Sequence, residues 1–197
     1  MKSVMKAVLV LTVAGLVGPV SAALTNGNFE TGDLTDWFTG GSATIAIVSD
    51  NGPSALGSYS VQMGTPGSRD LRSQGIALIP GDACTLVFDY KTSVGATGNP
   101  QVRFRFWDNL GDGGTYGTFK GEVQRTLDLT DGEWVTIDPM EMIAPDGAVA
   151  VDVVFTINVF GSFDGEVEFD NVVATVPEPA TMALLGLGGL LLRRKRS

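Results

Sequence analysis

The chain has no histidine and a single cysteine among its 197 residues. Without histidine it can contain no Ser-His-Asp triad, no Cys-His pair and no His-ligated zinc site, which excludes many hydrolase mechanisms. The single Cys84 excludes an intrachain disulfide. Cys84 alternates with Leu86 and Phe88, which indicates a buried thiol in a core strand rather than a nucleophile.

Basic residues are also few, 13 against 22 acidic residues. Six of the 13 lie in two terminal segments described below, whereas every acidic residue lies between Glu30 and Glu178, so the central part of the chain carries a net charge of −15. A surface this acidic repels nucleic acid and anionic lipid. We therefore expect no nucleic-acid partner. The charge suits a soluble extracellular protein, or one that binds divalent cations or neutral sugars.

The N-terminal segment has the three parts of a secretory signal peptide. Lys2 and Lys6 form a positive start, residues 7–17 are apolar, and Val20-Ser21-Ala22 has the small-x-small pattern that precedes a cleavage site. We predict a signal peptide over 1–22 and a mature start at Ala23. The alternative is a core helix that begins the fold.

The C-terminal segment, 176–197, combines a Pro-Glu-Pro turn with an apolar run, 180–192, and a basic end. Prolines end regular structure, an apolar run can enter a membrane, and basic residues stay on the cytoplasmic side. The run has 13 residues, and as a helix it would span about 20 Å of a bilayer core about 30 Å thick. We predict a short, transient membrane anchor; the alternative is an apolar strand or helix packed on the domain.

These parts in this order resemble the PEP-CTERM sorting signal of proteins exported by Gram-negative bacteria. The resemblance implies that exosortase, a membrane enzyme, recognises the tail and cleaves near the Pro-Glu-Pro. It implies an exported protein at the cell envelope or outside the cell, anchored transiently in the inner membrane. The sorting residues would be Pro177, Glu178, Pro179, Arg193, Arg194, Lys195 and Arg196.

Between the terminal segments the sequence predicts β-structure throughout. Residues 84–90, 101–107 and 149–157 alternate between an apolar and a mixed face with period two. Turn signals separate these from further candidate strands at 43–49, 58–63, 70–79, 119–128, 133–140 and 166–175. Many short strands at this spacing favour a two-sheet sandwich, which we place at 23–175 as one domain.

The domain has a resemblance of its own. It begins Asn26-Gly27-Asn28-Phe29-Glu30 and ends Glu168-Phe169-Asp170-Asn171-Val172, with Gly57-Ser58-Tyr59-Ser60-Val61 and Leu78-Ile79-Pro80-Gly81 between. This ordered series resembles carbohydrate-binding modules of the galactose-binding-like group. It implies an all-β jelly-roll β-sandwich, here flanked by a signal helix and a short C-terminal hydrophobic helix. Jelly rolls host many functions, so the resemblance supports the fold better than it supports sugar binding.

Glu30 and Asp170 form one candidate site, because the first and last strands of a jelly roll can be neighbours. In the modules that the domain resembles, matching positions commonly bind a structural calcium ion. Calcium takes six to eight oxygen ligands and mixes carboxylates with backbone carbonyls. The alternative is a pair of surface carboxylates or caps of turn amides. The loop at 108–114 lacks the ligand spacing of an EF-hand and is better interpreted as a solvated hairpin loop.

A second candidate site is the mixed face of 101–107, which presents Arg103, Arg105 and Trp107. A flat aromatic ring beside bidentate donors suits a sugar, since the ring stacks on C–H groups and the charges bond hydroxyls. The alternative is an ordinary solvent face with Arg–Asp cross-strand pairs. Side chains that could share this face are Asp89 and Thr85 on one neighbouring strand, and Asp152, Thr156 and Asn158 on another. Tyr116 could line a rim, whereas Trp37 and Trp134 are expected to pack structurally.

The sequence therefore predicts an exported, non-catalytic envelope or extracellular-matrix protein, with an extracellular polysaccharide as the candidate ligand. One alternative is a purely structural matrix component. The other is a glycoside-active enzyme, since paired carboxylates hydrolyse glycosides, although nothing in the sequence fixes such a pair.

Overall fold

The computed structural model describes residues 21–42, 44–49, 57–110, 116–158 and 163–177. The apolar core of the predicted signal peptide and the predicted tail from Glu178 onward lie outside these residues. Every element of regular structure within the described part is a β-strand. No helix in the described part is long and apolar enough to cross a membrane.

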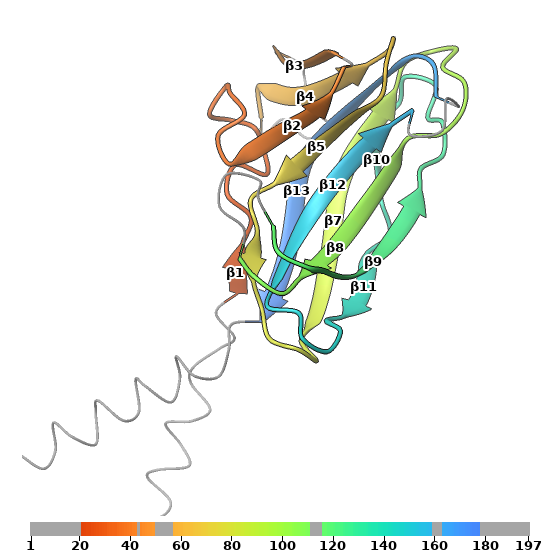
Figure 1. Ribbon diagram of the computed structural model, residues 1–197. Coiled ribbons are helices and arrows are strands. Elements are labelled where there is room, and N and C mark those ends of the chain that lie inside the picture. Colours follow the sequence, from red (N-terminus) through yellow and green to blue (C-terminus); the bar gives the residue numbers. More distant parts are fainter. Residues whose placement is uncertain (1–20, 43, 50–56, 111–115, 159–162, 178–197) are drawn as a thin grey trace, which may run out of the picture.

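The strands form two sheets that face each other as two layers (Figure 1), and every strand pairing is antiparallel. The first sheet, sheet A, has the order β10-β7-β13-β4-β3, with β11 also on β7 and β1 on β13. Its strands are β1 (Ser21–Ala23), β3 (Thr44–Ser49), β4 (Tyr59–Gly64), β7 (Ala83–Thr92), β10 (Val135–Thr136), β11 (Met140–Ile143) and β13 (Glu166–Pro177).

The second sheet, sheet B, has the order β2-β5-β12-β8-β9, with β6 also on β12. Its strands are β2 (Trp37–Gly41), β5 (Arg69–Ser73), β6 (Ile76–Ala77), β8 (Gln101–Trp107), β9 (Phe119–Thr126) and β12 (Ala150–Ile157). Two packed antiparallel sheets confirm the predicted all-β sandwich.

The core lies between the sheets and is dominated by aromatic rings. Phe155 of β12 stacks on Phe169 of β13 with ring centroids 3.9 Å apart, and Phe88 of β7 meets Phe155 edge-on at 4.9 Å. Trp37 stacks on the other side of this cluster, 5.9 Å from Phe155, and is buried as expected. Burying each ring stabilises the fold by about 1.5–3 kcal/mol. The aromatic contacts therefore join the two sheets across the sandwich.

Cys84 is buried in the same core, as its alternation predicted. Burial, helped by the nearby charge of Asp82, raises the pKa of its thiol from 9.0 to about 11. The thiolate is the reactive form of cysteine, so this position is unsuited to a nucleophile.

The three segments with period two all become strands, and two longer predicted strands are broken. The segment predicted at 70–79 divides into β5 and β6, with Gln74 and Gly75 between them. The segment predicted at 133–140 divides into β10 and β11, separated by a stretch that includes Pro139. Proline cannot donate to a sheet ladder, which explains the second break.

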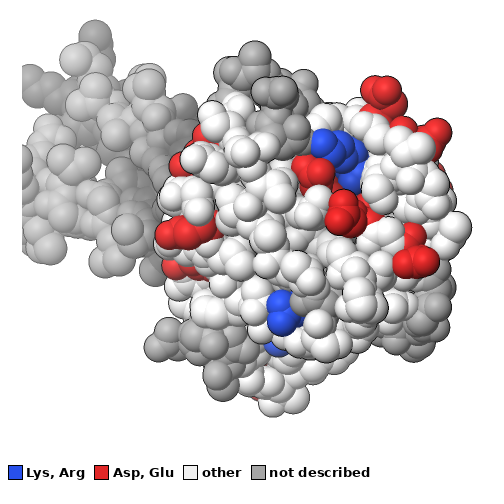
Figure 2. Space-filling view, turned by 90° about the horizontal axis from the view of Figure 1, so that it is seen from above, with Lys and Arg blue, Asp and Glu red and all other residues white. Residues whose placement is uncertain are grey.

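The first described strand, β1, and the end of the last, β13, lie at the same end of the sandwich (Figure 1). Strand β1 pairs with the last residues of β13, so that Ser21 faces Pro177 and Ala23 faces Thr175. The predicted signal-peptide cleavage site after Ala22 therefore lies beside the start of the Pro-Glu-Pro. The end seen from above in Figure 2 shows scattered acidic side chains and few basic ones.

Candidate functional site

The outward side chains of β8 lie on the outer face of sheet B, where they are half-buried. Alternation along β8 buries Val102, Phe104 and Phe106 against sheet A and turns Arg103, Arg105 and Trp107 outward. The register in which β8 and its neighbouring strands pair then determines which residues lie beside these three side chains. Outward neighbours are Asp152, Val154 and Thr156 on β12, Asp70 and Arg72 on β5, and Glu122 and Gln124 on β9. We call this surface, together with Tyr116, the Trp107 face.

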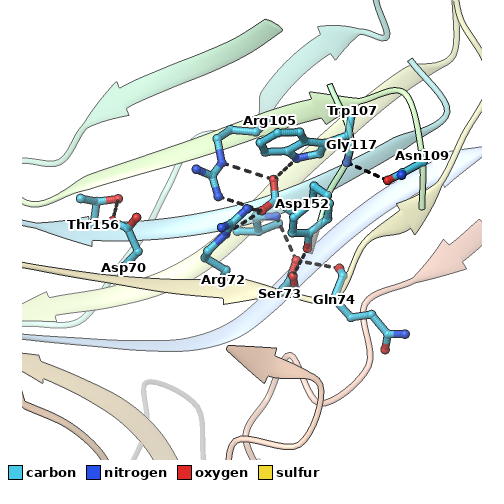
Figure 3. Close-up of polar contacts among 12 residues, drawn as sticks. Asp70, Arg72, Ser73, Gln74, Arg105, Trp107, Asn109, Gly117, Asp152 and Thr156 are labelled. Atoms are coloured by element: carbon cyan, nitrogen blue, oxygen red, sulfur yellow. Dashed lines mark hydrogen bonds and ion pairs between the residues drawn. The ribbon is translucent and has the colours of Figure 1, made fainter. Parts of the chain in front are cut away.

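Asp152 is the centre of the polar contacts on the Trp107 face (Figure 3). Its side chain is fully buried, yet it accepts hydrogen bonds from two arginines that approach from the strands on either side. Arg105 Nη2 lies 2.9 Å from Asp152 Oδ2, and Arg72 donates to the same oxygen through Nε and Nη2 at 3.3 Å. Trp107 Nε1 donates to Asp152 Oδ1 at 2.9 Å. One carboxylate thus holds two guanidinium groups and the indole ring in place.

The aromatic part of the face is a stack of two rings. Trp107 and Tyr116 lie with centroids 4.9 Å apart and ring planes at 23°, and Phe119 meets Trp107 edge-on at 5.7 Å. The guanidinium of Arg72 lies 4.8 Å from the Tyr116 ring and that of Arg105 lies 5.4 Å from the Trp107 ring. Cation–π contacts of this kind add to the hydrogen bonds in fixing the ring positions.

Tyr116 is tied to the sheet through its hydroxyl, which donates to the backbone oxygen of Ser73 at 2.7 Å. Burial is the main cause that raises the pKa of Tyr116, and the charge of Asp152 raises it further. The phenol therefore stays protonated and keeps donating. The prediction that Tyr116 lines the rim is refined: its ring is part of the aromatic stack.

The hairpin that carries Tyr116 is closed at its base by side-chain caps. Asp108 Oδ1 accepts from the Thr118 amide at 2.7 Å, and Asn109 Oδ1 accepts from the Gly117 amide at 2.8 Å. The Thr118 amide is the main cause that lowers the pKa of Asp108. A β-carbon on Gly117 would collide with Asp108 Oδ1, so a larger residue here would displace these caps. These contacts agree with a hairpin loop rather than a calcium loop; residues 111–115 lie outside the described part.

Arg103 differs from the other two arginines of the face. Its Nη2 donates to Gln101 Oε1 at 3.4 Å, while its Nε is buried without a hydrogen-bond partner among the residues that the structure describes. Its cross-strand neighbours, Val154 and Gln124, are uncharged. Within the described part of the chain, Arg103 therefore has no carboxylate partner.

Two of the residues predicted to share the Trp107 face do not. Asp89 and Thr85 lie on β7, which belongs to sheet A, so the prediction that they share this face from a neighbouring strand is wrong. Asp89 instead accepts hydrogen bonds from Thr136 Oγ1 and, at 2.8 Å, from Asn171 Nδ2. The error arose because period two assigns a residue to a face of its own strand but does not assign the strand to a sheet.

Asn158 also departs from the prediction. It follows the end of β12 with a positive φ of 57°, which breaks the alternation that would have placed it beyond Thr156. Its Nδ2 donates to the backbone oxygen of Gly67 at 3.4 Å, so it belongs to the connection at the end of the sheet. Asp152 and Thr156 lie where they were predicted, and Thr156 Oγ1 donates to Asp70 Oδ1 at 3.0 Å.

Glu30 and Asp170 do come together, at Gly57. A β-carbon on Gly57 would lie 2.6 Å from Glu30 Oε1 and 3.8 Å from Asp170 Oδ2. Glu30 Oε1 also accepts from the amides of Ser58 and Tyr59 at 2.8 and 3.0 Å. Glycine at 57 thus leaves room for two carboxylates from the opposite ends of the domain. Among the described residues, no group of three or more acidic or cysteine side chains could hold a metal ion.

A separate cavity of about 330 Å³ lies at the edge of the sandwich, between the end of β9 and β10. Tyr90, Arg125 and Asp138 are among its lining residues. The cavity lies near Thr126, which faces Gln101 at one end of β8, whereas Trp107 faces Phe119 at the other end. Sequence reasoning did not find it, because its lining depends on how residues 125–128 and 135–138 lie against Tyr90 of β7.

The sequence comparison now identifies the domain. The family model described as a carbohydrate binding domain, CBM_4_9, matches residues 21–157. The chain belongs to this family of carbohydrate-binding domains. A second model, the PEP-CTERM protein-sorting motif, matches residues 175–196. Both families are non-catalytic. No curated protein matches the chain.

Solved structures share the fold of this carbohydrate-binding domain at low sequence identity. The enzymatically active domain of tailspike protein 4 of bacteriophage CBA120 is 17% identical with a TM-score of 0.65; the match covers 80% of this chain but 21% of that one. TmCBM61, solved with β-1,4-galactotriose, is 18% identical with a TM-score of 0.52 over 77% of this chain and 95% of that one. The Stig cyclase Fisc from Fischerella sp. TAU is 16% identical with a TM-score of 0.58, and the match covers 82% of this chain and 100% of that one. These neighbours differ in activity, so they show the jelly-roll fold alone.

Proposed function

We propose that the protein is an exported, non-catalytic glycan-binding protein of the cell envelope, and that the Trp107 face binds the glycan. The observation that carries this proposal is the arrangement around Asp152. A stacked pair of aromatic rings lies beside two arginines, and a single buried carboxylate holds both arginines and the indole. This is a rigid surface with both apolar and hydrogen-bonding parts.

Each part of the Trp107 face suits one side of a sugar. Aromatic rings present apolar faces on which the C–H groups of a pyranose stack, and arginine N–H groups bond hydroxyl or carboxylate oxygens in a planar fork. The rings and guanidinium groups are already immobilised by Asp152 and by the Tyr116 hydroxyl bond, so binding needs little further ordering.

The match to the PEP-CTERM motif supports the sorting half of the proposal. The protein would be exported, held transiently in the inner membrane by its tail and processed by an exosortase near Pro177, Glu178 and Pro179. The basic end, Arg193, Arg194, Lys195 and Arg196, would stay on the cytoplasmic side until cleavage.

We also propose that Glu30 and Asp170 bind a structural calcium ion. Two carboxylates that converge on a glycine repel each other unless a cation or proton lies between them. Calcium accepts carboxylate and backbone carbonyl oxygens together, so two acidic ligands are compatible with a site completed by the backbone. The ion would join the start and the end of the domain and would have no part in catalysis.

The glycan proposal is tested by measuring binding of the purified protein to a panel of neutral and acidic polysaccharides. Trp107→Ala should abolish binding to whichever polysaccharide the wild type binds. Trp134→Ala is the matched control, because Trp134 is half-buried and contacts Lys91, a residue of β7 in the other sheet. Circular dichroism and thermal unfolding would show that both variants fold. If the wild type binds no polysaccharide in the panel, a purely structural matrix component is the better interpretation.

A further inference from the structure

We propose that the Trp107 face selects an anionic glycan, one that carries uronate carboxylates, and that Arg103 is the residue that recognises the carboxylate. This inference rests on the proposed function, because it names the chemical class of glycan for the same face. It reverses the expectation from overall charge, which favoured neutral sugars.

The acidic excess of the domain does not extend over this face. Its three guanidinium groups, those of Arg72, Arg103 and Arg105, are matched in number by the carboxylates of Asp70, Asp152 and Glu122, and Arg72 and Arg105 share Asp152. The domain as a whole carries −15 and contains seven basic residues between 23 and 178. Placing three of the seven on one sheet face concentrates positive charge where a ligand would lie.

Other acidic groups on the face lie at its flanks. Glu122 is exposed and faces Arg105 from β9, and Asp70 lies toward the end of β5, where it accepts a hydrogen bond from Thr156. Neither forms an ion pair with Arg103 among the described residues. Arg103 is therefore the guanidinium on this face that is left without a carboxylate partner in the described part of the chain.

Arg103 has the geometry to bind a carboxylate. Among the described residues it makes one hydrogen bond, from Nη2 to Gln101 Oε1, which is long at 3.4 Å, and it has no carboxylate partner. A bidentate carboxylate would accept from two N–H groups of the guanidinium in the planar fork that arginine presents. A neutral hydroxyl would accept from one donor at a time and would leave the charge of Arg103 unpaired. Uronate therefore fits both the donors and the charge.

The experiment compares saccharides in anionic and neutral pairs, and the two hexamer pairs differ at C6 alone. Hexamers of β-1,4-linked glucuronate and of α-1,4-linked galacturonate are titrated beside their carboxyl-reduced, neutral forms, with dextran sulfate and dextran as a third pair. We expect at least one uronate hexamer to bind tenfold or more tightly than its neutral form. Its affinity should fall as salt is raised, because exposed charges are screened.

Variants of Arg103 separate specific recognition of the uronate carboxylate from a general attraction between opposite charges. R103Q should weaken uronate binding by about tenfold to a hundredfold, as expected when a charge-assisted hydrogen bond is lost, and should weaken binding to the neutral form less. R103K keeps the charge but lacks the planar fork, so it should lie between R103Q and wild type. R125Q is the control: it also removes one positive charge, but Arg125 lines the separate cavity rather than the Trp107 face.

The outcomes distinguish this inference from the proposed function. Binding of neutral hexamers as tightly as uronates, lost in Trp107→Ala, would overturn the anionic assignment and leave glycan binding intact. Equal effects of R103Q and R125Q would overturn the role of Arg103. Binding of dextran sulfate without any uronate would overturn the carboxylate assignment in favour of sulfate. Failure to bind any member of the three pairs would count against both proposals.

Discussion

Removing the Asp152 carboxylate should destabilise the fold by about 3 kcal/mol. Asp152→Ala deletes the acceptor of five hydrogen bonds, donated by Arg72, Arg105 and Trp107. Breaking a buried ion pair by removing one partner costs about 3–5 kcal/mol, since it leaves an uncompensated charge. The Arg72 and Arg105 side chains remain 23% and 12% exposed, so water partly replaces the lost acceptor and the lower end of that range applies.

The assay is urea unfolding followed by tryptophan fluorescence, with thermal unfolding as a second measure. A loss of about 3 kcal/mol in a domain of this size lowers Tm by about 6–12 °C. Glu122→Ala is the matched control, since Glu122 faces the same Arg105 from β9 but is exposed; its removal should cost less than about 1 kcal/mol. If Asp152→Ala costs no more than Glu122→Ala, the carboxylate does not hold the Trp107 face together.

Three further outcomes are expected. If calcium joins Glu30 to Asp170, calcium at a hundredfold excess over Kd should stabilise the wild type by about 2.7 kcal/mol, and Asp170→Ala should not be stabilised. A Tm that does not change when chelator is added, with no calcium found by elemental analysis, would refute the site. Cys84 should react with a thiol reagent at pH 8 far more slowly in the folded than in the urea-unfolded protein, and equal rates would contradict its burial. Because burial raises the pKa of the thiol from 9.0 to about 11, the contribution of Cys84 to stability is present below about pH 9 and is lost as the pH rises toward 11. Replacing Glu178 with Ala should leave an uncleaved, membrane-retained form; an intact Arg193–Ser197 end on wild-type protein from the envelope, seen by mass spectrometry, would show that cleavage does not occur.

Local periodicity was enough to predict the three strands with clear alternation and the faces of their side chains. Strand β8 has the predicted bounds, and Arg103, Arg105 and Trp107 share its outward face because alternation is a property of consecutive residues. Strand β2 was missed, since its Gly40 and Gly41 resemble a turn rather than a strand. The resemblance of the domain to carbohydrate-binding modules is confirmed by the family match.

The residues that meet at the site are brought together by strand pairings that could not be predicted from the sequence. Arg72 and Asp152 are 80 residues apart, and their contact follows from the register of β5 and β12 rather than from either strand alone. Asp89 was misplaced for the same reason, since its strand joined the opposite sheet. The approach of Glu30 and Asp170 was predicted from a resemblance, and the missing side chain of Gly57 is the feature that permits it.

The most direct test of the account is to map where a bound glycan lies. Amide chemical shifts of the isotope-labelled protein should be followed while the tightest-binding oligosaccharide is added. The account predicts that the largest changes, together with shifts of the Trp107 indole N–H, fall on β5, β8 and β12 around Asp152. Changes confined to β7 and β13, or to the cavity lined by Tyr90 and Arg125, would contradict the assignment of the Trp107 face as the binding site.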